Sequence, residues 1–422
     1  MKTLIQPVKG TRDFYPEEMS IRTWLYQQIK KVSSSFGYEE YEGPILERLD
    51  LYAAKSGEEL VKEQSFVFSD RGGDQITLRP ELTPTLARMI AQKQNELAFP
   101  VRWWSFGPFW RYERPQKGRT REFFQWNIDI LGVDSPEADA ELVAVAASFF
   151  QSVGLTPNEI KIFVNNRRLM DVTLAEMGIA PENRKTVFHI IDRRDKLNPN
   201  SWKEYALECG LTPDQFEQLC HILEDKDLWK KSDELVRFFN VLKAMKLDEF
   251  VVFDPQVIRG LEYYTGTVFE GRDAAGEGRA VFGGGRYDNL VGDVGGDPLP
   301  GVGFAMGDVM VTLLLQKYGK IPAKQEQQKM VLVTIFDSTL LPSSFSLANK
   351  LRLEGITVVT YPEAVKLQKQ LKFADRKGIR FAAIQGPDEA AANTVTLKDL
   401  LKREQQTVPV EEAGKTLQSM MA

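Results

Sequence analysis

The 422-residue sequence contains very little cysteine or histidine, with two residues of each. Cys209 and Cys220 are too few for a disulfide scaffold, and together with His189 and His221 they make a cysteine–histidine metal cluster a poor interpretation. So few histidines also argue against catalysis by a serine–histidine–aspartate triad or a cysteine–histidine pair. The composition therefore sets aside several enzyme classes before any motif is considered.

Long apolar runs and a strong net charge are also missing. No uncharged apolar run approaches the about 18–20 residues that span a bilayer, and residues 1–14 lack the apolar core of a signal peptide. Lysine and arginine number 54 against 59 acidic residues, a formal charge of −5, so any basic binding surface must be local. We expect a soluble, cytoplasmic protein with no membrane partner.

What the sequence does have is enough apolar material for a large core, with 43% hydrophobic and 27% charged residues. Its length predicts several domains at about 100–200 residues each. The patterns predict a helix over 16–36, a long hairpin over 101–132, a helix over 134–154 and a strand over 160–166. They also predict strands over 250–270 and 279–283, followed by a helix near 308–318.

Two later segments change in character. Residues 172–248 are charged and mostly helical, and we interpret them as a helical insertion with helix starts near Thr212 and Ser232. The polar segment 319–328 is typical of a linker. Beyond it, strand patterns over 330–336, 356–361 and 381–386 alternate with helical ones, which predicts βαβ units and a parallel sheet.

The hairpin carries the first chemical pattern. Arg111 and Glu113 share one face of its first strand, and the loop that follows adds Lys117, Arg119 and Arg121. Guanidinium groups bind phosphate oxygens in pairs, so this cluster suits a polyphosphate. The alternative is an edge hairpin whose charges prevent aggregation.

Polar residues recur at strand spacing at two further places. Glu81 and Thr83 lie two apart on a segment that we expect to be extended, so both would point to one side and could hold an ammonium group, or simply form a surface turn. On the return strand of the hairpin, Gln125, Asn127 and Asp129 share a face. A buried polar face must be paired, so this face is either solvated or lines a pocket.

The remaining patterns are weak when each is taken alone. Residues 259–267 combine an arginine, two tyrosines and small residues, and glycines are dense over 283–288 and 301–307. Neither glycine string matches the dinucleotide fingerprint or the P-loop. A basic stripe at helical spacing is either a solvated face or a site for RNA phosphates, and it comprises Lys366, Lys369, Lys372, Arg376, Lys377 and Arg380.

Taken together and in this order, these segments resemble the histidyl-tRNA synthetase family of class II aminoacyl-tRNA synthetases over nearly the whole chain. Residues 37–47 resemble motif 1, 109–132 resemble motif 2, and 301–307 stand where motif 3 belongs. Residues 259–270 and 283–291 resemble two histidine-specific segments, and residues 330–420 resemble the anticodon-binding domain.

The resemblance implies an α+β fold, in which the antiparallel class II sheet is flanked by helices. It implies a catalytic domain over residues 1–325 with the helical insertion 172–248 within it, and a small α/β anticodon-binding domain over 329–422. The implied activity is ATP-dependent formation of histidyl-adenylate followed by transfer of histidine to the 3′-terminal adenosine of tRNA(His). ATP, Mg²⁺, histidine and the tRNA are then the ligands, and the implied assembly is a homodimer.

The resemblance also assigns residues, position by position. Arg111 and Arg259 would be catalytic at the α-phosphate. The histidine-binding set would be Glu81, Thr83, Gln125, Asp129, Tyr263, Tyr264 and Tyr287. The ATP-binding set would be Arg111, Glu113, Arg119, Arg121 and Arg259. No residue is assigned to a metal.

The chain departs from the family pattern at two places. The family usually has glutamate where this chain has Asp129. After Gly307 the family has a Glu-Arg pair, whereas Val309 and Met310 stand at those positions here, so the arginine that packs on adenine is missing. The alternative interpretation is a non-catalytic, histidine-sensing paralogue such as the regulatory subunit of ATP phosphoribosyltransferase.

Overall fold

The structure is a computed structural model that describes residues 4–53, 64–116, 118–258, 263–276, 279–322 and 329–421. It divides into two compact units, Met1–Ile321 and Pro322–Ala422, and each is considered by itself. None of the described helices is both long enough and apolar enough to cross a bilayer.

An eight-stranded sheet forms the centre of the first unit, in the order β1-β5-β6-β11-β10-β9-β7-β8. The pairs β1–β5 and β7–β8 are parallel and the others are antiparallel, which confirms the predicted, mainly antiparallel α+β body. The strands are β1 Glu39–Glu40, β5 Val101–Trp110, β6 Glu122–Leu131, β7 Ile160–Asn166, β8 Val251–Phe253, β9 Thr267–Asp273, β10 Phe282–Tyr287 and β11 Gly301–Gly307.

The predicted hairpin is the pair β5–β6, which stays in register from Val101↔Leu131 to Trp110↔Glu122. Alternating side chains give it two distinct faces. Trp104, Trp126 and Ile128 point to a face that is covered by helices, and their side chains are essentially inaccessible to solvent.

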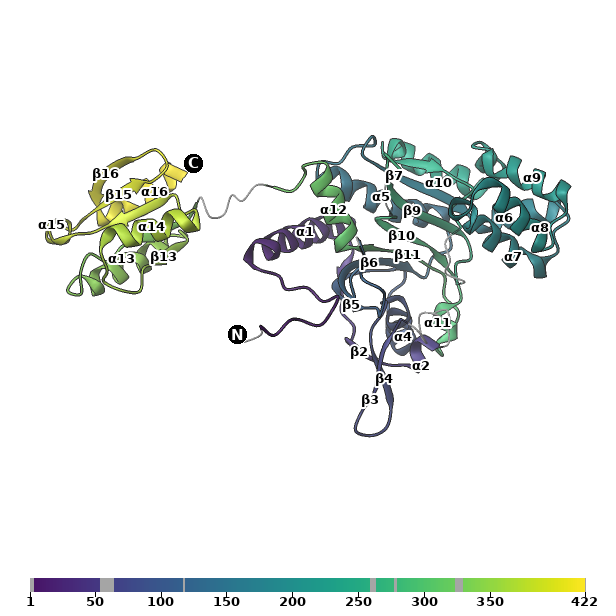
Figure 1. The fold of residues 1–422 in the computed structure, drawn as a ribbon, viewed down its shortest axis with the longest axis horizontal. Coiled ribbons are helices and arrows are strands. Elements are labelled where there is room, and N and C mark those ends of the chain that lie inside the picture. Colours follow the sequence, from purple (N-terminus) through teal and green to yellow (C-terminus); the bar gives the residue numbers. More distant parts are fainter. Residues whose placement is uncertain are drawn as a thin grey trace. The chain divides into compact units, whose positions relative to one another are not determined.

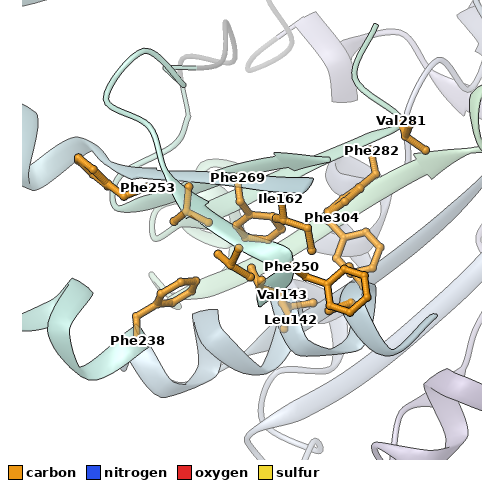
Figure 2. Packing of buried hydrophobic residues seen from close by; sticks show 14 of the residues in the cluster. Leu142, Val143, Ile162, Phe238, Phe250, Phe253, Phe269, Val281, Phe282 and Phe304 are labelled. Carbon is orange, nitrogen blue, oxygen red and sulfur yellow. The ribbon is translucent and has the colours of Figure 1, made fainter. Parts of the chain in front are cut away.

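Helices of the first unit cover this face of the sheet, and their apolar residues form the main core (Figure 2). They are α1 Pro16–Ser35, α5 Pro136–Ser152, α10 Asp233–Ala244 and α12 Asp308–Lys317. In Figure 2, Leu142 and Val143 of α5 lie against Ile162 of β7 and Phe269 of β9. Helix α5 begins where the Ser135 side chain accepts the backbone N–H of Ala138, as an N-cap should.

The opposite face of the sheet is only partly covered, by short elements near the chain's N-terminal third. A three-stranded sheet, in the order β2-β4-β3, consists of β2 Leu46–Arg48, β3 Phe66–Ser69 and β4 Gln75–Leu78. The helices here are α2 Asp50–Ala53, α4 Thr83–Lys93 and α11 Leu290–Asp293. A second apolar cluster joins Leu86 and Ile90 of α4 to Leu131 of β6 and Tyr287 of β10. The remainder of this face is available for a site.

The predicted helical segment forms a lobe of short helices beside β7 (Figure 1). They are α6 Arg167–Glu176, α7 Pro181–Asp192, η1 Arg194–Lys196, α8 Pro199–Glu208, α9 Pro213–Glu224 and η2 Leu228–Lys231, followed by α10 and η3 Asp248–Phe250. Both predicted helix starts are confirmed. Thr212 caps α9 in a capping box with Gln215, and Ser232 caps α10.

The second unit holds a five-stranded sheet in the order β13-β12-β14-β15-β16, and its core is separate from that of the first unit. Its elements are β12 Val331–Val333, α13 Leu341–Leu353, β13 Val358–Thr360, α14 Leu367–Lys377, β14 Phe381–Ile384, α15 Pro387–Ala391, β15 Thr394–Asp399, β16 Glu404–Pro409, η5 Val410–Glu412 and α16 Ala413–Met421.

The expectation of a wholly parallel sheet in this unit is wrong. β12 pairs in parallel with β13 and β14, as predicted, but β15 and β16 add an antiparallel hairpin. The turn between them places Arg403 at a φ of 60°, a conformation that few non-glycine residues adopt. Because the turn carries no glycine or proline, the sequence gave no indication of a hairpin there.

Candidate active site

The exposed face of the central sheet gathers most of the predicted site residues. On β6, Gln125, Asn127 and Asp129 share this face, because alternate residues of a strand point to the same side. Register then fixes their neighbours. Asp129 lies between Trp103 of β5 and Gly303 of β11, and Gln125 lies opposite Gly307. The polar row predicted from the sequence therefore lies beside a strand of glycines.

Those glycines create the hollow in which the polar groups meet. A Cβ atom at Gly303 would overlap Oδ1 of Asp129. A Cβ atom at Gly301 would approach the Tyr287 ring to 2.6 Å, and one at Gly285 would approach the Tyr264 ring to 2.8 Å. The two weak glycine strings of the sequence thus have one physical function, which is to leave room for side chains that cross the sheet surface.

A buried acid lies at one end of this hollow. The Tyr287 hydroxyl donates to Oδ1 of Asp129 at 2.7 Å, and both side chains are almost fully shielded from solvent. Burial raises the pKa of Asp129 to about 7, and the hydrogen bond from Tyr287 opposes that rise only in part. A buried carboxylate with so perturbed a pKa is typical of a binding site for a hydrogen-bonding or basic ligand.

Tyrosines surround this acid. The Tyr263 and Tyr264 rings are 4.9 Å apart, and Tyr263 lies edge-on to Tyr287 at 6.2 Å. The structure therefore brings together four of the predicted histidine-binding residues, Asp129, Tyr263, Tyr264 and Tyr287. Their arrangement offers aromatic walls and one acid, which suits a small, flat, polar ring.

Farther along the same face lies a cavity of about 840 Å³. It contains four of the predicted residues, namely Arg111, Glu113, Arg119 and Gln125. It also contains residues that the sequence analysis did not assign, including Lys196, Glu270, Arg272 and Arg279. Glu270 and Arg272 alternate with buried Phe269 and Gly271 on β9, so this strand's alternation was the available indication.

The motif 2 cations are held by backbone and carboxylate partners. Nε of Arg111 donates to the carbonyl of Pro80 at 2.9 Å, and its guanidinium lies 5.5 Å from the centre of the Phe123 ring. Arg119 forms an ion pair with Glu113 at 2.6 Å. Both arginines line the cavity, and a cavity with fixed guanidinium groups can bind an anion with little reorganisation.

Arg121 lies apart from the residues that line this cavity. Its guanidinium lies 3.9 Å from the centre of the Tyr112 ring, and its Nε donates to the carbonyl of Glu113. Its backbone N–H donates to the carbonyl of Gly10. In this structure Arg121 therefore connects the motif 2 loop to the N-terminal segment.

The expected extended conformation around Glu81 and Thr83 is wrong. Thr83 is the first residue of α4, because Pro84 favours a helix start at this point. Glu81 precedes the helix and is buried. Two predicted cations, Arg259 and Lys117, lie outside the described residues.

The segment that replaces motif 3 has well-defined contacts. Asp308 begins α12, where its carboxylate accepts the backbone N–H of Phe124 and pairs with Arg12, both at 2.9 Å. Met310 packs on the motif 2 loop, since a Cβ atom at Gly118 would lie 2.5 Å from its sulfur. Val309 and Met310 both line the cavity. The family's arginine position is thus occupied by an apolar contact to the loop.

Among the described residues, no group of three or more histidine, cysteine or acidic side chains is placed to hold a metal ion. The cavity does contain single carboxylates, Glu113 and Glu270. Magnesium usually keeps several waters and takes one or two carboxylates together with substrate phosphates. The donor set therefore fits a Mg²⁺ ion that is shared with a polyphosphate better than a dedicated protein cage.

Comparisons with known proteins agree with this geometry. A family model described as histidyl-tRNA synthetase matches residues 10–309, and one described as anticodon binding domain matches residues 328–420. The chain is 36% identical to a histidine–tRNA ligase of Leptospira biflexa, over 98% of this chain and 97% of that protein. It is 37% identical to a chloroplastic/mitochondrial histidine–tRNA ligase of Arabidopsis thaliana, over 97% of this chain and 86% of that protein.

Solved structures show the same relationship. Histidyl-tRNA synthetase from Nostoc superposes with a TM-score of 0.85 at 27% identity, with all of both chains covered. A Bacillus halodurans structure titled as an ATP phosphoribosyltransferase regulatory subunit/histidyl-tRNA synthetase has a TM-score of 0.73 at 21% identity, over 88% of this chain and 97% of that chain. At that identity the second match supports the fold alone.

Proposed function

The chain belongs to the histidyl-tRNA synthetase family, and from this premise we infer that it is a histidine–tRNA ligase. In the first step the histidine carboxylate attacks the α-phosphorus of ATP, and the bond to pyrophosphate breaks. In the second step a hydroxyl of the tRNA's terminal adenosine attacks the acyl carbon, and AMP leaves. The observation that carries this function is the buried Asp129–Tyr287 pair, on the same sheet face as a cavity that contains arginines.

Histidine would bind where the acid and the phenols converge. Asp129 would accept a hydrogen from the imidazole, Tyr264 would be the second ring partner, and Tyr263 and Tyr287 would enclose the ring. A site built on hydrogen bonds rejects ligands that lack them by roughly 10⁴–10⁵. The α-ammonium group would be held by Glu81, Thr83 and Gln125.

ATP would occupy the cavity. Arg111, with Arg259 opposite it, would stabilise the charge that develops at the α-phosphate, and Glu113, Arg119 and Arg121 would act on the rest of the nucleotide. This assignment rests on the family pattern and, for Arg111, Glu113 and Arg119, on their place in the cavity. Positioning and charge stabilisation then supply most of the rate, as in other phosphoryl and nucleotidyl transfers. Mg²⁺, held by Glu113 or Glu270, would neutralise phosphate charge.

The cavity offers replacements for the missing motif 3 arginine. Arg272 and Arg279 line it from β9 and from the segment that follows. Arg272 also lies over the Phe163 ring at 5.6 Å, which is a platform that flat groups can share. We assign these two arginines to the outer part of ATP.

The tRNA and a second copy of the chain would bind elsewhere. The basic stripe on α14 remains accessible at Lys369, Lys372 and Arg376, which suits contacts with RNA phosphates. Exposed apolar side chains gather on and beside the small sheet, which belongs to the motif 1 region, and support a homodimer through that surface. They are Ile45, Leu46, Val67 and Phe68.

The decisive experiment is ATP–pyrophosphate exchange with each of the twenty amino acids. We expect exchange with histidine only, and exchange with a different amino acid would contradict the assignment. Binding of histidine without any exchange would instead favour the regulatory paralogue.

Substitution of Arg111 tests its role in the reaction. Arg111→Ala should lower exchange by about 10²–10³, the usual cost of removing one group that stabilises a transition state. Arg352→Ala is the control, since Arg352 is an exposed cation in the second unit, bonded to Thr360. Equal activity of the two variants would exclude Arg111 from the reaction.

A further inference from the structure

Tyr41 presents a buried hydroxyl that the proposed mechanism does not yet use. Among the described residues, this hydroxyl has no hydrogen-bond partner. A buried hydroxyl without a partner costs free energy, so native proteins keep very few of them. Such a group at the edge of a binding pocket indicates a partner that is present only when a ligand is bound.

Local structure directs Tyr41 toward the amino-acid pocket. Its backbone N–H donates to the carbonyl of Trp104 at 2.9 Å, which continues the parallel pairing of β1 with β5. Its ring lies 5.4 Å from that of Trp103, at an interplanar angle of 33°. Trp103 is the cross-strand neighbour of Asp129. The tyrosine thus leans across one strand toward the strand that carries the acid.

Packing and charge agree with this placement. Tyr41 packs against the apolar cluster that contains Tyr287. Burial, and then the nearby carboxyl group of Asp129, raise the pKa of Tyr41 well above its ordinary value, so the hydroxyl keeps its proton and is available as a donor. Tyr41 in turn contributes to the raised pKa of Tyr287. The two phenols and the acid therefore form one electrostatic group.

We propose that Tyr41 is a positioning residue of the amino-acid pocket, whose hydroxyl donates a second hydrogen bond to Asp129 when histidine is bound. This inference rests on the proposed function. Tyr287 already donates to one carboxylate oxygen from β10, and Tyr41 would approach from the side of β1. Two donors would hold a short acid in one orientation toward the imidazole.

The requirement for ligand follows from the state of the acid. Without a ligand, an Asp129 whose pKa is near 7 is often protonated and does not require a second donor. A carboxylate that accepts a hydrogen from an imidazole N–H is ionised, and an ionised, buried carboxylate is stabilised by each further donor. The Tyr41 hydroxyl would therefore find its partner at the moment when histidine enters.

The test is Tyr41→Phe, which removes one oxygen atom and keeps the ring against Trp103. We expect the KM for histidine in ATP–pyrophosphate exchange to rise about tenfold, which corresponds to about 1.4 kcal/mol. The KM for ATP and the Tm should stay at the wild-type values. The matched control is Tyr38→Phe, because Tyr38 is also buried but donates to Glu141 on the helix-covered face.

Each outcome decides the proposal. A KM for histidine within twofold of wild type would overturn it, as would a fall in Tm accompanied by equal changes in both KM values. An equal rise in Tyr38→Phe would show a general packing effect and would also overturn it. Loss of histidine-dependent exchange in the wild-type protein would instead refute the proposed function, and histidine binding measured by calorimetry would then compare the two variants.

Discussion

At the scale of single residues, the site is made as much by missing side chains as by those present. Gly301, Gly303 and Gly285 leave the space into which Tyr287, Asp129 and Tyr264 lean. A sheet face of ordinary residues would be filled by its own side chains. Glycine at these positions is required for close approach, even though it costs strand stability.

Gly303→Ala tests this requirement directly. The new methyl group would overlap Oδ1 of Asp129, so we expect the KM for histidine to rise more than tenfold or binding to be lost. Gly307→Ala on the same strand is the control, because nothing lies within 4 Å of its added Cβ atom. Similar histidine KM values for the two variants, both folded by circular dichroism, would contradict the close approach.

Asp129 also makes a prediction about stability and pH. Its pKa is about 7 in the folded protein against an ordinary value of 3.8, so over this range the folded state holds a proton that the unfolded chain has released. The contribution of this group to stability is therefore complete below the lower value and is lost as pH rises through about 7.

Asp129→Asn removes that titration. In the absence of ligands, the Tm of the variant minus that of the wild type should increase between about pH 5 and pH 7 and then level off. Thermal unfolding at several pH values measures the difference. Parallel curves for the two proteins would show that the acid is not desolvated in the way the structure indicates.

At the scale of elements, β10 serves two faces at once. Tyr287 points to the site face, while the preceding residue, Arg286, points to the helices and is 2% exposed. Arg286 pairs with buried Asp139 of α5 at 2.5 Å and donates to the carbonyls of Val133 and Ser135. The strand that positions the tyrosine is thereby anchored to the start of the helix behind the sheet.

Removing one partner of this buried pair should be costly, because a buried charge would remain without compensation. We expect Arg286→Ala to lower the free energy of unfolding by about 3–5 kcal/mol. Arg237→Ala is the control, since Arg237 pairs with Glu137 of the same helix α5 at an exposed position, where pairs contribute about 0–1 kcal/mol. Urea unfolding of both variants decides the question, and equal losses would contradict the importance of burial.

At the scale of the whole molecule, the chain forms two units with separate cores. All residues proposed for adenylate formation belong to the first unit, and the α14 basic stripe belongs to the second. Truncation after Ile321 should therefore preserve histidine-dependent exchange within about threefold, while tRNA charging falls by 10² or more as phosphate contacts are lost.

Exchange and aminoacylation assays on the truncated protein measure the two activities side by side. A parallel loss of both would show that the first unit depends on the second. Full retention of charging would remove the second unit from tRNA recognition.

The sequence by itself determined the elements with strong periodicity. The hairpin of β5 and β6, the capped helices α9 and α10, and the alternating polar row from Gln125 to Asp129 were all predictable, because side-chain spacing and local caps act over a few residues. The family, and with it the activity, also followed from motifs in their order along the chain.

Tertiary structure alone decided which groups meet. Asp129 and Tyr287 are 158 positions apart, and only the pairing of β6, β11 and β10 brings them together. The helical start at Thr83, the place of Arg121 outside the cavity lining and the antiparallel hairpin β15–β16 likewise depend on contacts that no local pattern encodes. Sequence fixes local conformation through short-range sterics, whereas burial and strand register, which set the pKa of Asp129 and the surroundings of Tyr41, exist only in the folded chain.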